Sequence, residues 1–104
     1  MSKSSSLPIA IPVDALRTFC EQYPVRRLAL FGSALRSDFT SESDIDLLVE
    51  YQPGARVTLL DMAQQEIELS ELIGRKVDLR TPNELSRYFR QRVIDEAVTL
   101  YERN

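Results

Sequence analysis

Two acidic residues, Asp44 and Asp46, lie two positions apart at the start of an apolar run. On a strand, side chains at this spacing point to the same face, and their Cα atoms lie roughly 6.6 Å apart. Two such carboxylates can converge on one or two divalent cations. Oxygen ligands favour Mg²⁺ or Mn²⁺ over zinc, and the chain contains no histidine. The pair therefore predicts a magnesium or manganese site.

A second motif, Gly32-Ser33, follows the preceding apolar run. A small residue and a hydroxyl at a strand-to-helix turn can hold phosphates, because backbone N–H groups and the helix dipole favour anions there. Gly-Ser is also a common turn, and Ser-Asp before an apolar run can simply flank a strand. Taken together, the two motifs favour a phosphate cradle facing a divalent-metal site.

The spacing of these motifs resembles that of a known family. Gly32-Ser33, ten intervening residues (34–43) and Asp44-x-Asp46 are similar to the signature of the minimal nucleotidyltransferases of the polymerase-beta-like superfamily. The resemblance runs from about residue 13 and includes Gly-Arg-Lys-Val-Asp-Leu at 74–79. It departs at Leu35-Arg36-Ser37, where the family often has Ala-Arg-Gly; Arg36 matches and Ser37 does not.

The resemblance implies a set of site residues. Asp44, Asp46 and Asp78 would be the catalytic and metal-binding residues, holding two Mg²⁺ ions or Mn²⁺, with ATP as substrate. Gly32, Ser33 and Arg36 would bind the nucleotide. For Asp78, the residues alone leave function and a plain strand position equally open, since Val77 and Leu79 would be buried and Asp78 would face away. The resemblance implies that Asp78 completes the metal site or accepts the proton of the attacking hydroxyl.

Small members of this family resemble the antitoxin halves of two-gene toxin–antitoxin systems. The resemblance implies transfer of AMP from ATP to a tyrosine of a HEPN-type toxin encoded by a neighbouring gene, within a hetero-oligomer. Two segments, 61–73 and 87–92, are candidate docking surfaces, since aromatic and arginine side chains are enriched at interfaces. Two alternatives stay open: an antitoxin that acts by binding alone, and nucleotidyl transfer to an RNA end or a small-molecule hydroxyl.

Composition limits the remaining possibilities. The chain has 104 residues, 43% of them hydrophobic, which predicts one domain over 12–104 after a mobile tail at 1–11. Sixteen acidic against thirteen basic residues, net −3, argue against a nucleic-acid partner. The tail lacks an apolar stretch long enough for a membrane span. Cys20, on an apolar helical stripe, reads as a core residue in a protein of the reducing cytoplasm.

Hydrophobic periodicity predicts an α/β fold of the α+β type, with a small mixed sheet of three or more strands flanked by four to five helices. We expect helices at 12–23, from 33, at 58–73 and at 84–102, and strands at 25–31, 43–51 and 76–81. Gly74 should cap the third helix. The expected buried positions are Leu59, Ala63, Ile67 and Ile73 in that helix, and Leu85, Phe89, Val93, Ala97 and Leu100 in the last one.

Two residues, Glu66 and Tyr88, leave a choice open. Glu66 falls in the apolar sector of the helix at 58–73, where it would either extend to solvent along its own stem or support the acidic site from behind. Phe89 is expected in the core. Tyr88 fits either the core or a docking surface.

Overall fold

The computed structural model describes residues 11–35 and 43–103. In chain order they form α1 (Val13–Gln22), β1 (Val25–Phe31), the 3-10 helix η2 (Gly32–Leu35), β2 (Ile45–Tyr51), α2 (Leu59–Ile73), β3 (Val77–Arg80), the 3-10 helix η3 (Pro82–Glu84), α3 (Arg90–Glu96) and β4 (Val98–Glu102). The described strands form one sheet in the order β3-β2-β1-β4. β2 runs antiparallel to β1 and parallel to β3, and β4 runs antiparallel to β1. The mixed α/β sheet predicted from the sequence is confirmed.

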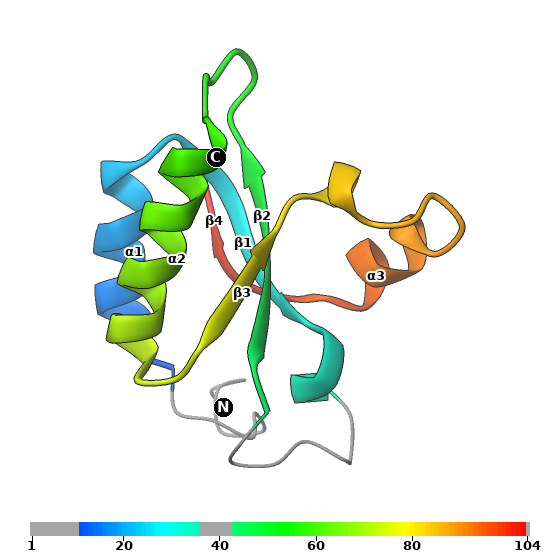
Figure 1. Ribbon diagram of the computed structural model, residues 1–104, viewed down its shortest axis with the longest axis horizontal. Helices are drawn as coiled ribbons and strands as arrows, with labels where there is room; N and C mark the ends of the chain where they lie inside the picture. The colour runs from blue at the N-terminus through cyan, green and yellow to red at the C-terminus, as the bar shows by residue number, and fades with distance from the viewer. Residues whose placement is uncertain (1–10, 36–42, 104) are drawn as a thin grey trace.

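The two longer helices, α1 and α2, lie side by side against one face of the sheet, while η3 and α3 lie toward the other side (Figure 1). The core is the apolar layer between α1, α2 and the sheet. Its fully buried side chains include Leu16, Leu28, Leu30, Leu47 and Leu69. Cys20 belongs to this core as predicted, and burial raises the pKa of its thiol to about 12.

Helix α2 begins and ends where the sequence predicts. Thr58 Oγ1 accepts a hydrogen bond from the Asp61 N–H at 3.1 Å, and Asp61 Oδ2 accepts one from the Thr58 N–H at 2.9 Å. This reciprocal pair satisfies N–H groups that have no partner within the helix. Gly74 closes the helix with φ 78°, a left-handed conformation that favours glycine. The predicted C-cap is confirmed.

The predicted buried face of α2 is wrong. Leu59 and Ile67 are 83% and 55% exposed, and Ala63 is also exposed, although Ile73 does pack against the core. The core side consists instead of Met62, Gln65, Leu69 and Ile73. Gln65 can be buried because its Oε1 accepts a hydrogen bond from the Tyr51 hydroxyl at 2.7 Å. With apolar residues on two sides, α2 offers two possible faces, and packing against the sheet selects one.

The predicted helix at 84–102 is also wrong. Only Arg90–Glu96 is α-helical, and Val98–Glu102 forms β4, which pairs with the edge of β1 that β2 does not occupy. The chain turns extended at Ala97, with ψ 142°. Phe89, expected in the core, is 50% exposed. Pairing of β4 with β1 satisfies backbone groups along the edge of β1, which a helix continuing to residue 102 would leave unpaired.

Within the described ranges, no helix is both long and apolar enough to cross a lipid bilayer. The longest of them, α2, has 15 residues. The predicted tail falls almost wholly at residues 1–10, outside the described residues.

Candidate active site

The Gly32 backbone and the Asp46 carboxylate lie against each other where β1 ends. Phe31 is paired with Asp46 across β1 and β2, so the turn that follows Phe31 begins beside this acid. A Cβ placed at Gly32 would lie 2.3 Å from Asp46 Oδ2. Gly32 also has φ 75°, which side chains with a Cβ rarely adopt. Both facts explain why glycine stands at the first position of the predicted phosphate cradle.

Asp78 lies beside Asp46 on the neighbouring strand. The parallel pairing of β2 and β3 sets Asp46 opposite Asp78. On each side of Asp78 the residues Val77 and Leu79 are buried in the core, so Asp78 faces the opposite side of the sheet, as predicted. Two carboxylates from different parts of the sequence thus share one face of the sheet.

Arg80, two residues after Asp78 on the same strand, forms a two-point ion pair with it. Its Nε and a terminal nitrogen lie 3.2 and 3.1 Å from the two carboxylate oxygens of Asp78. This hydrogen bonding raises the pKa of the Arg80 guanidinium. Both side chains are partly exposed, so solvent screens the pair. The pair compensates the charge of Asp78 next to Asp46.

Asp44 lies immediately before β2, with its side chain about half exposed. Its Oδ2 is 4.0 Å from Lys76 Nζ. In the described part of the chain, no three acidic, histidine or cysteine side chains are grouped closely enough to form a ready metal cluster. The donors nevertheless fit Mg²⁺ in kind, because Asp44, Asp46 and Asp78 supply oxygen ligands only. Because Gly32 has no Cβ, the Asp46 carboxylate can lie directly against the backbone of this turn.

A cavity of about 380 Å³ opens next to Asp46. Its lining combines Asp46 and residues at the end of β1 and in η2, namely Phe31, Gly32 and Leu35, with mostly apolar side chains before and within α3, namely Leu85, Phe89, Val93 and Glu96. Ligand pockets commonly have this size and a mainly apolar lining with a few polar groups. The sequence does not reveal this cavity, because its outer wall is formed by residues whose apolar spacing also fits a core-facing helix.

Arg90 fixes the segment that forms this wall. Its Nε donates to the Pro82 carbonyl at 2.7 Å, and a terminal nitrogen donates to the Leu85 carbonyl at 3.0 Å. Arg90 thereby ties the start of α3 to the turn at η3. The cavity wall is held by specific hydrogen bonds as well as by apolar contacts.

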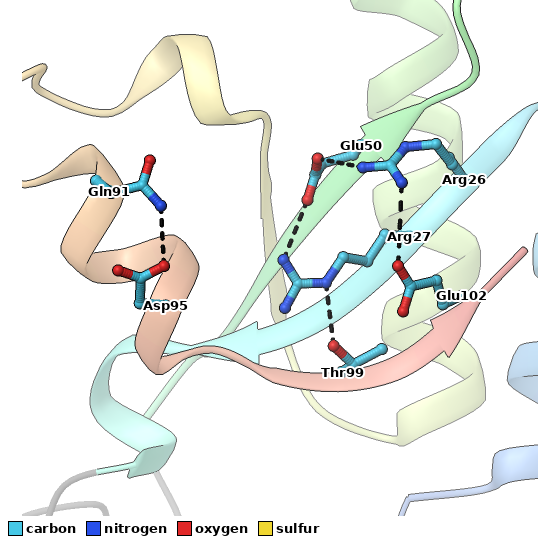
Figure 2. A network of polar contacts seen from close by, with 7 residues as sticks. All are labelled: Arg26, Arg27, Glu50, Gln91, Asp95, Thr99 and Glu102. Carbon is cyan, nitrogen blue, oxygen red and sulfur yellow. Dashed lines mark hydrogen bonds and ion pairs between the residues drawn. The ribbon is translucent and has the colours of Figure 1, made fainter.

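Farther along the sheet, polar side chains pair with one another (Figure 2). Arg27 lies between Glu50 and Thr99, with its guanidinium 3.2 Å from Glu50 Oε2 and 3.0 Å from Thr99 Oγ1. Arg26 approaches the other Glu50 oxygen at 2.8 Å. Glu50 therefore has two arginine partners from adjacent positions of β1. This part of the sheet has compensated charges and links β2, β1 and β4.

The structure brings together Gly32, Asp46 and Asp78, and it places Asp44 at the border of this group. Ser33 contributes backbone to η2, whereas Arg36 lies outside the described residues. The predicted helix opening at residue 33 is present as a 3-10 helix that starts at Gly32. A turn for phosphate, adjacent carboxylates and an apolar cavity together suit a ligand that carries both phosphates and an apolar ring system.

Comparison with known proteins gives a consistent result. The family model described as nucleotidyltransferase domain matches residues 14–100. A candidate protein adenylyltransferase of Methanocaldococcus jannaschii is 38% identical over 77 residues, which cover 74% of this chain and 81% of that protein. The protein adenylyltransferase MntA of Thermococcus cleftensis is 32% identical over 78 residues, covering 75% and 77%.

Solved structures agree with these sequence relatives. A candidate minimal nucleotidyltransferase has a TM-score of 0.68 at 34% identity, covering 83% of this chain and 86% of that one. A toxin–antitoxin structure with AMP-PNP has a TM-score of 0.71 at 18% identity, covering 90% and 76%. At that identity the second likeness shows a shared fold.

Proposed function

Because this chain belongs to the nucleotidyltransferase domain family, we propose that it transfers AMP from ATP to a tyrosine hydroxyl of a HEPN-type toxin and so neutralises it. Two kinds of likeness support the choice of acceptor. The sequence relatives named above are protein adenylyltransferases by name. Structures of the same fold include a complex of MntA with HepT, and a tri-AMPylated HEPN toxin with its MNT antitoxin from Shewanella oneidensis.

One observation carries the proposal most directly: the Gly32 turn lies against the carboxylate of Asp46, which is paired in register with Asp78. A phosphate held at the turn would lie next to these acids. Arg80 already pairs with Asp78, and a polyphosphate would add more negative charge, which further cations would neutralise. The site is therefore suited to a metal-bound triphosphate.

In this proposal Asp44, Asp46 and Asp78 hold two Mg²⁺ ions, or Mn²⁺. Bound metal supplies Lewis-acid stabilisation of the charge that develops on the α-phosphate and on the leaving group. The backbone amides of Gly32 and Ser33 and the Ser33 hydroxyl hold the β- and γ-phosphates, and Arg36 adds a charge-assisted contact. The nucleoside occupies the apolar cavity next to Asp46.

The reaction is a substitution at the α-phosphorus. The acceptor oxygen forms a bond to this phosphorus, and the bond from the phosphorus to the oxygen bridging to the β-phosphate breaks. The electron pair leaves with pyrophosphate, and the hydroxyl proton passes to Asp78 or to solvent. Positioning and electrostatic stabilisation account for most of the acceleration in such transfers.

Two exposed surfaces are available for the toxin, as the sequence suggests. α2 exposes Ile67 at 55%, and Leu59 and Leu60 at its start are also exposed. Near α3, Tyr88 is 86% exposed, with the Arg87 guanidinium 5.4 Å from its ring centre. An aromatic ring beside an arginine is typical of interface anchors. We assign these surfaces to a hetero-oligomer with the toxin in the cytoplasm.

The test is intact-mass spectrometry of the neighbouring-gene protein after incubation with this chain, ATP and Mg²⁺. We expect mass increases in AMP steps that disappear with Asp44→Asn. Asp14→Asn, an equivalent change at the exposed start of α1, should leave the transfer unchanged.

A stable complex without any mass increase would contradict the transfer and support neutralisation by binding alone. The exposed apolar residues of α2 make this the main alternative. A mass increase on an RNA 3′ end or on a small-molecule hydroxyl, with none on the toxin, would keep the enzyme and change its acceptor.

A further inference from the structure

We propose that Glu66 and Ser70 on α2 are positioning residues that hold β3 in the register which sets Asp78 beside Asp46. This inference rests on the proposed function, because it assigns Asp78 to the metal site. It also resolves the ambiguity of Glu66, which is half-buried and whose side chain reaches the backbone of β3.

The two side chains bind consecutive outward N–H groups of β3. Glu66 Oε2 accepts from the Leu79 N–H at 2.8 Å, and Ser70 Oγ accepts from the Val77 N–H at 3.0 Å. The Ser70 hydroxyl in turn donates to the Glu66 carbonyl at 2.8 Å. Since Glu66 and Ser70 are four positions apart, they lie on the same side of α2.

β3 depends on these contacts because it is an edge strand. It pairs with β2 on one side only and is four residues long, Val77–Arg80. The N–H groups of Val77 and Leu79 point away from β2, so without α2 they would face solvent or another chain. Asp78 lies between these two held residues. Its position relative to Asp46 is thus fixed from both edges of its strand.

A plain structural role predicts a different outcome from a positioning role. Buried Val77 and Leu79 already attach β3 to the core, so the strand has apolar reasons to stay folded. What those contacts do not supply is an exact position along the strand direction, since apolar contact is non-directional. Directional hydrogen bonds supply it, from β2 along one edge of β3 and from Glu66 and Ser70 along the other. The sensitive quantity is therefore metal affinity of the folded protein.

The experiment is a Mn²⁺ titration, followed by electron paramagnetic resonance, of the full chain with AMP-PNP. We expect Glu66→Ala to weaken Mn²⁺ binding by about 10- to 100-fold, the usual effect of losing a residue that orients a metal ligand. Glu66→Gln, which keeps an acceptor oxygen, should restore the affinity. Glu71→Ala removes the same charge from an exposed position of α2 and should bind as the wild type does.

Unfolding in urea, measured in parallel, confirms that each titrated variant is folded. If Glu66→Ala does not fold, Ser70→Ala takes its place, with Ser70→Thr as its rescue. Unchanged Mn²⁺ affinity in the folded alanine variant, beside a weakened Asp78→Asn, would overturn the positioning role and leave the transferase intact. Wild-type affinity in Asp78→Asn would overturn both this inference and the assignment of Asp78 as a ligand. No Mn²⁺ binding by the wild type would overturn the proposed function as well.

Discussion

On the face that α1 and α2 cover, the central strands β1 and β2 carry Leu28, Leu30 and Leu47, all fully buried. On the opposite face the same two strands carry Arg27, Asp46 and Glu50, all partly exposed. Burying a charge without a partner is costly, so these charged side chains lie on the face that solvent reaches. The apolar face in turn fixes the backbone that carries them.

The contrast between the two faces of the sheet shows how a small chain can combine a rigid backbone with a charged site. Side chains alternate along a strand, so each site residue has core residues as its immediate neighbours. Asp46 lies between Ile45 and Leu47, and Asp78 lies between Val77 and Leu79. A site built on strands is held more exactly than one built on loops. Substitutions at neighbouring positions should therefore have opposite consequences.

The largest effect is expected from Asp46→Asn. Losing this carboxylate should reduce AMP transfer by roughly 10³-fold, because metal stabilisation of the transition state is worth several kcal/mol. The fold should persist, since asparagine has nearly the same shape and lessens repulsion with Asp78. Transfer kinetics and urea unfolding measure the two quantities. A large drop in the free energy of unfolding alongside the loss of transfer would contradict a role of Asp46 that is confined to the site.

Leu47→Ala, one residue along, should do the reverse. Leu47 is fully buried, so its truncation should lower the free energy of unfolding by about 2–5 kcal/mol. Whatever fraction remains folded should transfer AMP at close to the normal rate. Urea unfolding gives the stability, and transfer rates scaled to the folded fraction give the activity. A loss of specific activity as large as that of Asp46→Asn would contradict the assignment of stability to the buried face and of activity to the exposed face.

Gly32→Ala tests the point where the turn touches the acid, and Gly74→Ala is its matched control. The two glycines have φ 75° and 78°, so each alanine should cost about 1–2 kcal/mol of stability. Only at Gly32 does the new Cβ meet Asp46 Oδ2, at 2.3 Å; at Gly74 no atom lies within 4 Å. Transfer should fall about a hundredfold in Gly32→Ala alone. Equal activity in both variants would show that the Asp46 contact is unimportant.

The parts of this architecture that local patterns determine were predictable. β1 has the predicted bounds, because its apolar run lies between Pro24 and Gly32, two residues that interrupt regular structure. Alternation along two strands puts Asp46 and Asp78 on the same face once those strands are neighbours, whereas their position opposite each other comes from the parallel register of β2 and β3. The assignment of these acids to a metal remains a prediction, from the motif for Asp44 and Asp46 and from the family resemblance for Asp78.

Other parts depend on contacts between distant segments, which a local pattern does not contain. The apolar residues Val93, Ala97 and Leu100 fit a helical period, yet Val98–Glu102 is also rich in β-branched and aromatic residues. Pairing with the edge of β1 selects the strand over the helix. In α2, the hydroxyl of Tyr51 allows Gln65 to face the core. The cavity wall cannot be predicted from the sequence for the same reason, because it forms only when residues 85–96 pack beside Asp46.

The smallest expected effect is a change in the pH dependence of stability, caused by Tyr51 on the face of the sheet that α1 and α2 cover. Burial, more than the nearby charges of Asp61 and Glu84, raises the pKa of Tyr51 from 10.0 to about 12. The folded protein therefore keeps the phenolic proton at pH values where the unfolded chain loses it. This contribution to stability is complete below pH 10 and is lost as the pH rises through about 12. Tyr51→Phe should remove it, so stability should fall less steeply over that range.

The raised pKa values of Cys20 and Tyr23 add slopes of the same sign, so only the difference between wild type and variant isolates Tyr51. At neutral pH the variant should also lose about 1 kcal/mol, because Gln65 loses its hydrogen-bond donor. Urea midpoints across the alkaline range measure both effects, with Tyr88→Phe as the control on an exposed phenol. Parallel curves for wild type and Tyr51→Phe would mean that the covered face does not hold this proton, and that solvent reaches β2 from the side that α2 is expected to seal.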